Sequence, residues 1–117
     1  MKVVTIINGT EFELSTRLRV AYKVQGCHNH KPYSEVFQDI GKMTLEQQLE
    51  ILFVAFQDAN PEVSLTFNKK AFQEYYLENF KLKQVMNQLQ GVIKGIMGDD
   101  ETPENQEDDT SEDTQGN

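Results

Sequence analysis

Residues 69–97 read KKAFQEYYLENFKLKQVMNQLQGVIKGIM, and this stretch decides most of the predicted fold. Its apolar residues recur at alternating steps of three and four, a spacing typical of one face of an α-helix. The stripe consists of Phe72, Tyr75, Asn79, Leu82, Met86, Leu89, Ile93 and Ile96, and the polar Asn79 is its only interruption. A second line of apolar residues widens the same face and consists of Tyr76, Phe80, Val85 and Val92. A face of this width must pack against the rest of the chain or against another protein, and it indicates binding rather than catalysis.

The stretch predicts either one long helix or two shorter ones. Asn68 is a suitable N-cap residue for its beginning. Residues 78–81 contain weaker helix formers and place Asn79 on the stripe, so a bend there is as well supported as continuity. Gly91, Gly95 and Gly98 loosen the final turns.

The charge of the chain is concentrated at its C-terminal end. The 117 residues carry a formal charge of −8, and nine of the 19 acidic residues lie in residues 99–117, which contain no Lys or Arg. The other acidic residues nearly balance all 11 basic ones, so residues 1–98 carry about +1. We therefore predict a folded domain at 1–98 and a disordered acidic tail at 99–117. A nearly neutral body gives no electrostatic case for binding nucleic acid.

The acidic tail has three interpretations. It can solvate the protein and limit aggregation, it can imitate nucleic acid and occupy a basic partner, or it can end the short form of a longer product. Its lack of hydrophobic anchors favours the solvating role.

The N-terminal residues predict a β-hairpin. Val3–Ile7 is β-branched throughout, Asn8-Gly9 is a strong two-residue turn sequence, and Glu11–Leu14 alternates polar and apolar residues. An isolated hairpin is marginally stable in water, so it must rest on helices or join strands of another subunit. The predicted fold class is therefore α+β, mostly α: an N-terminal hairpin followed by four or five helices.

Three further helices are predicted between the hairpin and residue 68. The first begins with Ser15 or Thr16 as cap and runs to about Gln25, with Gly26 ending it. Its inward side is predicted to carry Leu18, Ala21, Tyr22 and Gln25. A short helix is expected at Tyr33–Ile40, after a polar loop.

The third of these helices starts with the capping-box pair Thr44 and Gln47. Its apolar residues are Leu45, Leu49, Ile51, Leu52, Phe53, Val54, Ala55 and Phe56. Because they occupy nearly the whole circumference towards its C-terminal end, this helix is predicted to be central and buried. Asp58–Pro61 turns the chain, and Ser64–Phe67 is either an extended link or a short strand.

The cysteine count and the apolar runs limit the location of the protein. A single Cys excludes an intrachain disulfide. The first apolar run is short and lacks the pattern of a signal-peptide cleavage site, and no run approaches the roughly 18 residues of a membrane span. We expect a soluble, intracellular protein.

Residues able to carry chemistry are few. Cys27, His28 and His30 are the soft metal ligands, and no further Cys or His completes the four that zinc needs, so a polar loop is favoured over a metal site. Carboxylates of residues 1–98 fall mostly on polar helix faces, where solvation is their default role. The sequence contains no glycine-rich phosphate loop. We expect no enzymatic activity, no cofactor and no metal.

The order of these elements resembles the tail assembly chaperones of long-tailed bacteriophages and prophages. The resemblance covers roughly residues 12–97. It is carried by Phe12–Leu18, where a strand runs into a capped helix, by Met43–Phe56 followed by Asn60-Pro61, by the aromatic segment Phe72–Phe80, and by the closing helix Lys83–Met97.

This resemblance implies a non-enzymatic role. Chaperones of this family bind the long helical tape-measure protein while tail-tube subunits polymerise around it, and they are not retained in the virion. It further implies self-association, the cytoplasm of a bacterial host, and for many members a longer frameshifted form. We expect the tape-measure protein as partner, with tail-tube subunits as a further one, and neither nucleic acid nor membrane.

The partner-binding residues that we predict lie on the C-terminal stripe: Phe72, Tyr75, Tyr76, Leu82, Met86, Leu89 and Ile93. For the aromatic ones, a place in the core is the competing interpretation and is favoured by the residues taken alone. The alternative function is a small regulatory protein whose acidic tail occupies a basic site on a nucleic-acid enzyme. Loss of binding on removal of residues 99–117 would favour that alternative.

Overall fold

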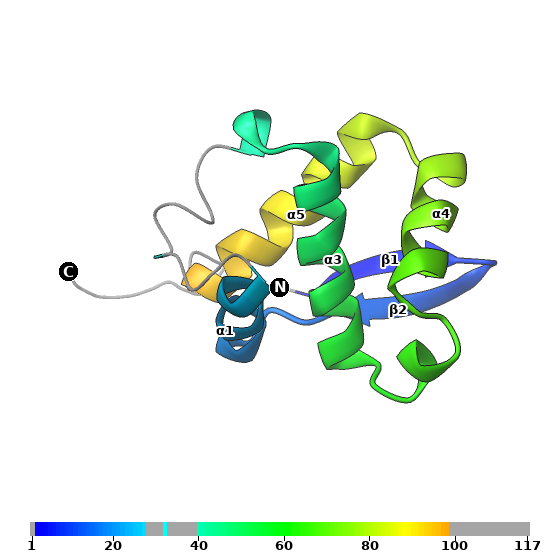
Figure 1. Cartoon of the computed structure of the whole chain (residues 1–117), viewed down its shortest axis with the longest axis horizontal. Coiled ribbons are helices and arrows are strands. Elements are labelled where there is room, and N and C mark those ends of the chain that lie inside the picture. The colour runs from blue at the N-terminus through cyan, green and yellow to red at the C-terminus, as the bar shows by residue number, and fades with distance from the viewer. Residues whose placement is uncertain (1, 28–31, 33–39, 99–117) are drawn as a thin grey trace.

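The computed structural model of the chain describes residues 2–27, 32 and 40–98 (Figure 1). Their fold is α+β and mostly helical, as predicted: an antiparallel β-hairpin followed by four α-helices. Two predictions lie outside the described residues, namely the body of the short helix at 33–39 and the disordered tail at 99–117. Ile40–Lys42 forms a single 3-10 turn (η1) ahead of the central helix.

The hairpin consists of β1 (Val3–Ile7) and β2 (Thr10–Leu14), with Val3 opposite Leu14 and Ile7 opposite Thr10. Asn8 and Gly9 form its two-residue turn with φ of 53° and 81°, the left-handed values that the sequence predicts for such a pair. Ile7 and Leu14 are buried, whereas Glu11 and Glu13 point to solvent. The hairpin prediction is confirmed.

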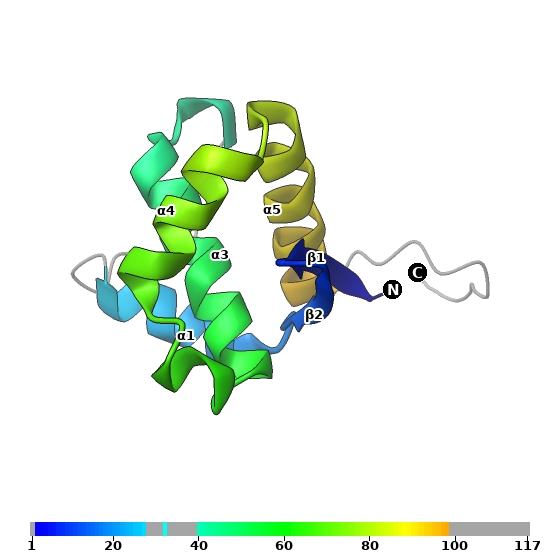
Figure 2. The ribbon, with the colours of Figure 1, turned by 90° about the vertical axis from the view of Figure 1, so that its right-hand side faces the viewer.

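Helix α3 (Leu45–Ala59) lies at the centre of the fold. Seen along the hairpin, α3 and α4 (Lys69–Asn79) lie on one side of the core, and α5 (Leu82–Met97) and the hairpin lie on the other (Figure 2). The capping box is present: Gln47 N donates to Thr44 Oγ1 at 3.1 Å, and Thr44 N donates to Gln47 Oε1 at 2.9 Å. All six side chains from Ile51 to Phe56 are buried, so the prediction of a central helix is confirmed.

Helix α1 (Leu18–Cys27) differs from its prediction in two respects. Its buried side consists of Val20, Ala21 and Val24, whereas Leu18 and Tyr22 are 66% and 77% exposed. Both sets have helical spacing, so the rotation of the helix about its axis is decided by tertiary contacts near its start. The helix also continues through Gly26, because a glycine inside a helix costs only about 1 kcal/mol.

The segment after α3 is neither an extended link nor a strand, which corrects the prediction for Ser64–Phe67. Val63–Leu65 forms a 3-10 turn (η2). Ser64 N donates to Asn60 O at 3.1 Å and the Ser64 hydroxyl donates to Pro61 O at 2.9 Å, so the turn that begins at Asn60 continues through it.

Residues 69–97 form two helices, α4 (Lys69–Asn79) and α5 (Leu82–Met97). Asn68 caps α4 as predicted, since its side chain accepts from Ala71 N at 3.0 Å. Phe80 and Lys81 adopt extended backbone angles between the helices, so the chain turns just after Asn79. The bend divides the stripe between two helices that face the core from different directions (Figure 2).

Candidate functional site

A buried polar contact joins β1, α4 and α5. The Tyr76 hydroxyl lies 2.7 Å from both Thr5 Oγ1 and Gln88 Oε1, and Gln88 Nε2 donates to Thr5 Oγ1 at 3.3 Å. The Tyr76 ring stacks between Phe72 and Phe80, with centroid distances of 4.5 Å and 4.1 Å. Burial raises the pKa of Tyr76 to about 12. This hydroxyl therefore stays protonated near neutral pH and acts as a structural hydrogen-bonding group.

The seven predicted partner-binding residues do not form one surface. Phe72, Tyr76 and Leu89 lie in the core with at most 1% exposure, so they cannot contact a partner in this conformation. Their burial follows from the bend at residues 80–81, which folds the wide apolar face of each helix onto α3 and the hairpin. The half-buried members are Tyr75, Met86 and Ile93. Only Leu82, which is 58% exposed, is largely accessible.

Leu82 belongs to an apolar patch at the corner between α4 and α5. The accessible leucines there are Leu45, Leu77 and Leu82, with exposures of 40%, 59% and 58%. They surround a hollow of about 90 Å³ whose other walls are Leu49, Tyr76, Phe80 and Val85. We name Leu45, Leu77, Phe80 and Leu82 the corner patch. It brings together side chains from the start of α3, the end of α4 and the start of α5.

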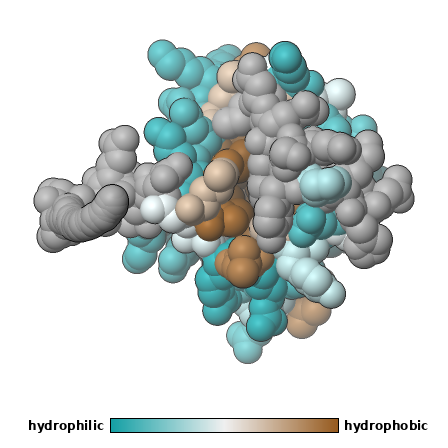
Figure 3. Space-filling view, turned by 90° about the vertical axis from the view of Figure 1, so that its left-hand side faces the viewer, coloured by the Kyte–Doolittle hydropathy of each residue, from teal (hydrophilic) through white to brown (hydrophobic). Residues whose placement is uncertain are grey.

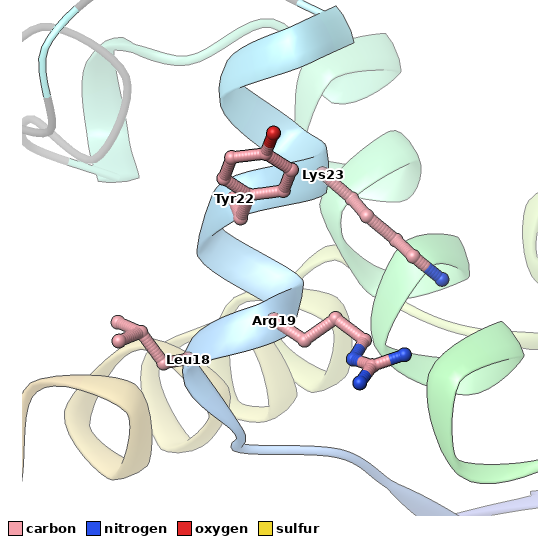
Figure 4. A pocket seen from close by; sticks show the side chains of 4 residues that line it. All are labelled: Leu18, Arg19, Tyr22 and Lys23. Atoms are coloured by element: carbon pink, nitrogen blue, oxygen red, sulfur yellow. The ribbon is translucent and has the colours of Figure 1, made fainter.

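A second surface lies on the outer side of α1. Figure 3 shows apolar surface in the middle of the face on which α1 lies, bordered by hydrophilic surface. Leu18 and Tyr22 project from this helix with Arg19 and Lys23 beside them, and together they line a pocket of about 550 Å³ (Figure 4). The two cations extend away from Leu18, towards the C-terminal end of α3 (Figure 4).

On that side, Arg19 and Lys23 also line a polar pocket of about 500 Å³ between α1 and the turn after α3. Arg17 lies in the same pocket, and its side chain is 69% exposed. We name Arg17, Arg19 and Lys23 the basic face. All three side chains are exposed to solvent.

The start of α1 is held by Asp58, whose side chain is only 4% exposed. The Ser15 hydroxyl and Arg17 Nε donate to Asp58 Oδ2 at 2.5 Å and 3.0 Å, and Arg17 Nη2 donates to Asp58 O at 3.1 Å. Desolvation by burial raises the pKa of Asp58, but hydrogen bonds from Ser15 and Arg17 and the charges of Arg17 and Lys23 outweigh it, so the pKa lies below its usual value. Asp58 is therefore charged at neutral pH and holds Arg17, one of the three cations of the basic face.

Metal-binding clusters and membrane-spanning helices were also sought among the described residues. Residues 2–27, 32 and 40–98 hold no group of three His, Cys, Asp or Glu residues placed to bind a metal ion. His28 and His30 lie outside these residues, so the loop interpretation of that segment stays a prediction. Within the described part of the chain, no helix is long and apolar enough to cross a membrane.

Comparison of the chain with protein-family models, with curated proteins and with solved structures gives no match. A function must therefore be inferred from the residues and surfaces described above.

The α1 surface differs from the sequence prediction, which has Leu18 and Tyr22 on the inward side of the helix. The sequence also offered the alternative, because Val20, Ala21 and Val24 form a second apolar stripe at helical spacing on the same segment. The corner patch was found only in part, through Leu82. Its other members come from separate elements, and nothing in the sequence pattern brings them together.

Proposed function

We propose that this chain is a non-enzymatic tail assembly chaperone of a long-tailed bacteriophage or prophage. It binds the helical tape-measure protein in the cytoplasm of the bacterial host, with tail-tube subunits as a further partner, and leaves before the virion is complete. The order of motifs from Phe12 to Met97 supports this family, and the corner patch supports binding of an apolar helical partner.

The corner patch is the observation that carries the proposal. Three leucines with exposures between 40% and 59% surround one apolar hollow. A helix that presents apolar side chains at steps of three and four would place one side chain in the hollow and its neighbours on the leucines around it. The small size of the hollow suits a single anchoring side chain.

The limited area of this surface suits a partner that must be released. Complete burial of one leucine contributes about 1.5–3 kcal/mol, and each corner leucine is already partly buried, so each adds roughly 1 kcal/mol on binding. Association also costs translational freedom and side-chain freedom. One corner patch therefore gives weak binding, and several chaperone copies along a long helix would be needed for stable coverage.

The test is a pull-down of a tape-measure fragment by the full chain and by the variants Leu77→Lys and Leu82→Lys. A charge on the patch should weaken binding by about tenfold or more in each variant. Leu65→Lys is the matched control, because Leu65 is 82% exposed and lies on η2, away from the corner. Its binding should equal that of the unmodified chain.

Two results would contradict the proposal. If both corner variants remain folded by circular dichroism and retain the fragment as well as the control does, the corner patch is not the binding surface. If the unmodified chain does not bind the tape-measure fragment or tail-tube subunits at all, the assignment of function is wrong.

A further inference from the structure

The basic face of α1 has no assigned role in the proposed function. Arg17, Arg19 and Lys23 line one pocket of about 500 Å³, and the carboxylate of Asp58 balances only one of their three charges. This leaves a local excess of positive charge, although residues 1–98 as a whole carry about +1. A ligand for such a surface must supply several negative charges.

The same chain contains a segment of that kind. Residues 99–117 hold nine carboxylates, no Lys or Arg, and no Leu, Ile, Val, Phe, Tyr or Met. Contacts made by this segment must therefore be electrostatic and polar. The basic face is a suitable counterpart because its three cations line one pocket, Arg19 and Lys23 from α1 and Arg17 from the position just before it, with Gln57 and Ser64 in the same pocket.

The fold also places the end of α5, after which this segment follows in the sequence, next to the start of α1. The last turns of α5 pack against the start of α1, so closely that a Cβ added at Gly95 would lie 2.5 Å from Thr16 Cγ2 (Figure 1). Gly98 ends α5 three residues later. Since 19 extended residues span about 60 Å, more than the longest extent of the molecule at 43 Å, the segment is long enough to reach the basic face.

We propose that the basic face of α1 binds the acidic residues 99–117 of the same chain. The tether makes the contact intramolecular, so weak individual charge pairs act at a high effective concentration. The contact leaves the apolar side chains of Leu18 and Tyr22 uncovered and occupies the cations beside them. An acidic partner that approaches α1 must therefore displace the chain's own C-terminal residues. This inference does not depend on the proposed chaperone function.

The experiment compares amide spectra of two full-length chains by NMR. One is unmodified, and in the other the nine acidic residues of 99–117 are changed to Asn or Gln. At about 20 mM salt the amides of residues 17–23 should differ between the chains, and the difference should fall by at least about half at 300 mM, where charges are screened within a few ångströms. No difference at residues 17–23, or equal differences along α4 and α5, would overturn the proposal.

A second pair of variants tests the basic face. Arg19→Glu with Lys23→Glu should remove the salt-dependent shifts of the acidic residues. Lys70→Glu with Lys83→Glu makes the same change of charge at exposed cations of α4 and α5 and should leave those shifts in place. If the Arg19/Lys23 variant does not fold, the first comparison still tests the proposal, because the chain with Asn or Gln at the nine acidic positions has an unmodified folded domain. Shifts that depend on protein concentration would assign the contact to a second copy and overturn the single-chain proposal.

Discussion

Tyr76→Phe is the most informative single change, because it removes one oxygen from the point where β1, α4 and α5 meet. The ring and its stacking on Phe72 and Phe80 remain, so the measured effect belongs to the hydroxyl. Thr5 is 2% exposed and cannot recruit water once this partner is lost, although the longer bond from Gln88 remains. Gln88 is half-buried and can turn its amide oxygen to solvent.

The structure sets the size of the expected effect. One buried group loses its shorter hydrogen bond and one partly exposed group is rehydrated, so the loss falls near the lower end of the range for unsatisfied buried groups, at about 1–2 kcal/mol. For a domain of this size, each kcal/mol of lost stability lowers Tm by about 4–8 °C. Tyr76→Ala removes the stacked ring as well and should cost about 3–5 kcal/mol.

Urea unfolding followed by circular dichroism measures both values, and Thr5→Val completes a double-mutant cycle. Since valine leaves no polar group to satisfy at that position, the double variant Tyr76→Phe with Thr5→Val should lose less than the sum of the two single losses, by about 0.5–1 kcal/mol. A loss below about 0.3 kcal/mol for Tyr76→Phe, with additive single effects, would refute the assignment of this contact as a stabilising one.

Two further predictions concern α3. Leu52→Ala and Phe53→Ala should each lower the free energy of unfolding in urea by about 2–5 kcal/mol, because both side chains are buried in the core, whereas the exposed Leu65→Ala should change it by less than about 0.5 kcal/mol. Asp58→Asn should destabilise the chain at neutral pH. Because the pKa of Asp58 is lower in the folded chain than its usual 3.8, the stabilisation by the carboxylate is complete above that value and is lost as the pH falls through the folded pKa. The difference between the two chains in melts should therefore shrink below about pH 4, and a constant difference down to about pH 2 would contradict this reasoning.

Features that depend on neighbouring residues were predictable from the sequence. The hairpin turn at Asn8-Gly9 requires two left-handed residues, and these residue types tolerate that conformation. The caps at Thr44 and Asn68 use side chains that reach backbone groups three residues away. Such interactions are decided locally, so their positions agree between sequence and structure. Burial all around the second half of α3 was predictable for a related reason, since a helix apolar on every side cannot face water.

The orientation of each element in space required the tertiary structure. Helix α1 offers two apolar stripes, and the hydrogen bonds of Ser15 and Arg17 to Asp58, more than 40 positions away in the chain, select the one that is buried. The bend after Asn79 likewise turns Phe72, Tyr76 and Leu89 into the core and leaves Leu82 at a corner with Leu45 and Leu77. Periodicity reports which residues share a face of one helix. It carries no information on which of two faces meets the core, because that choice depends on the shape and polar groups of the other elements.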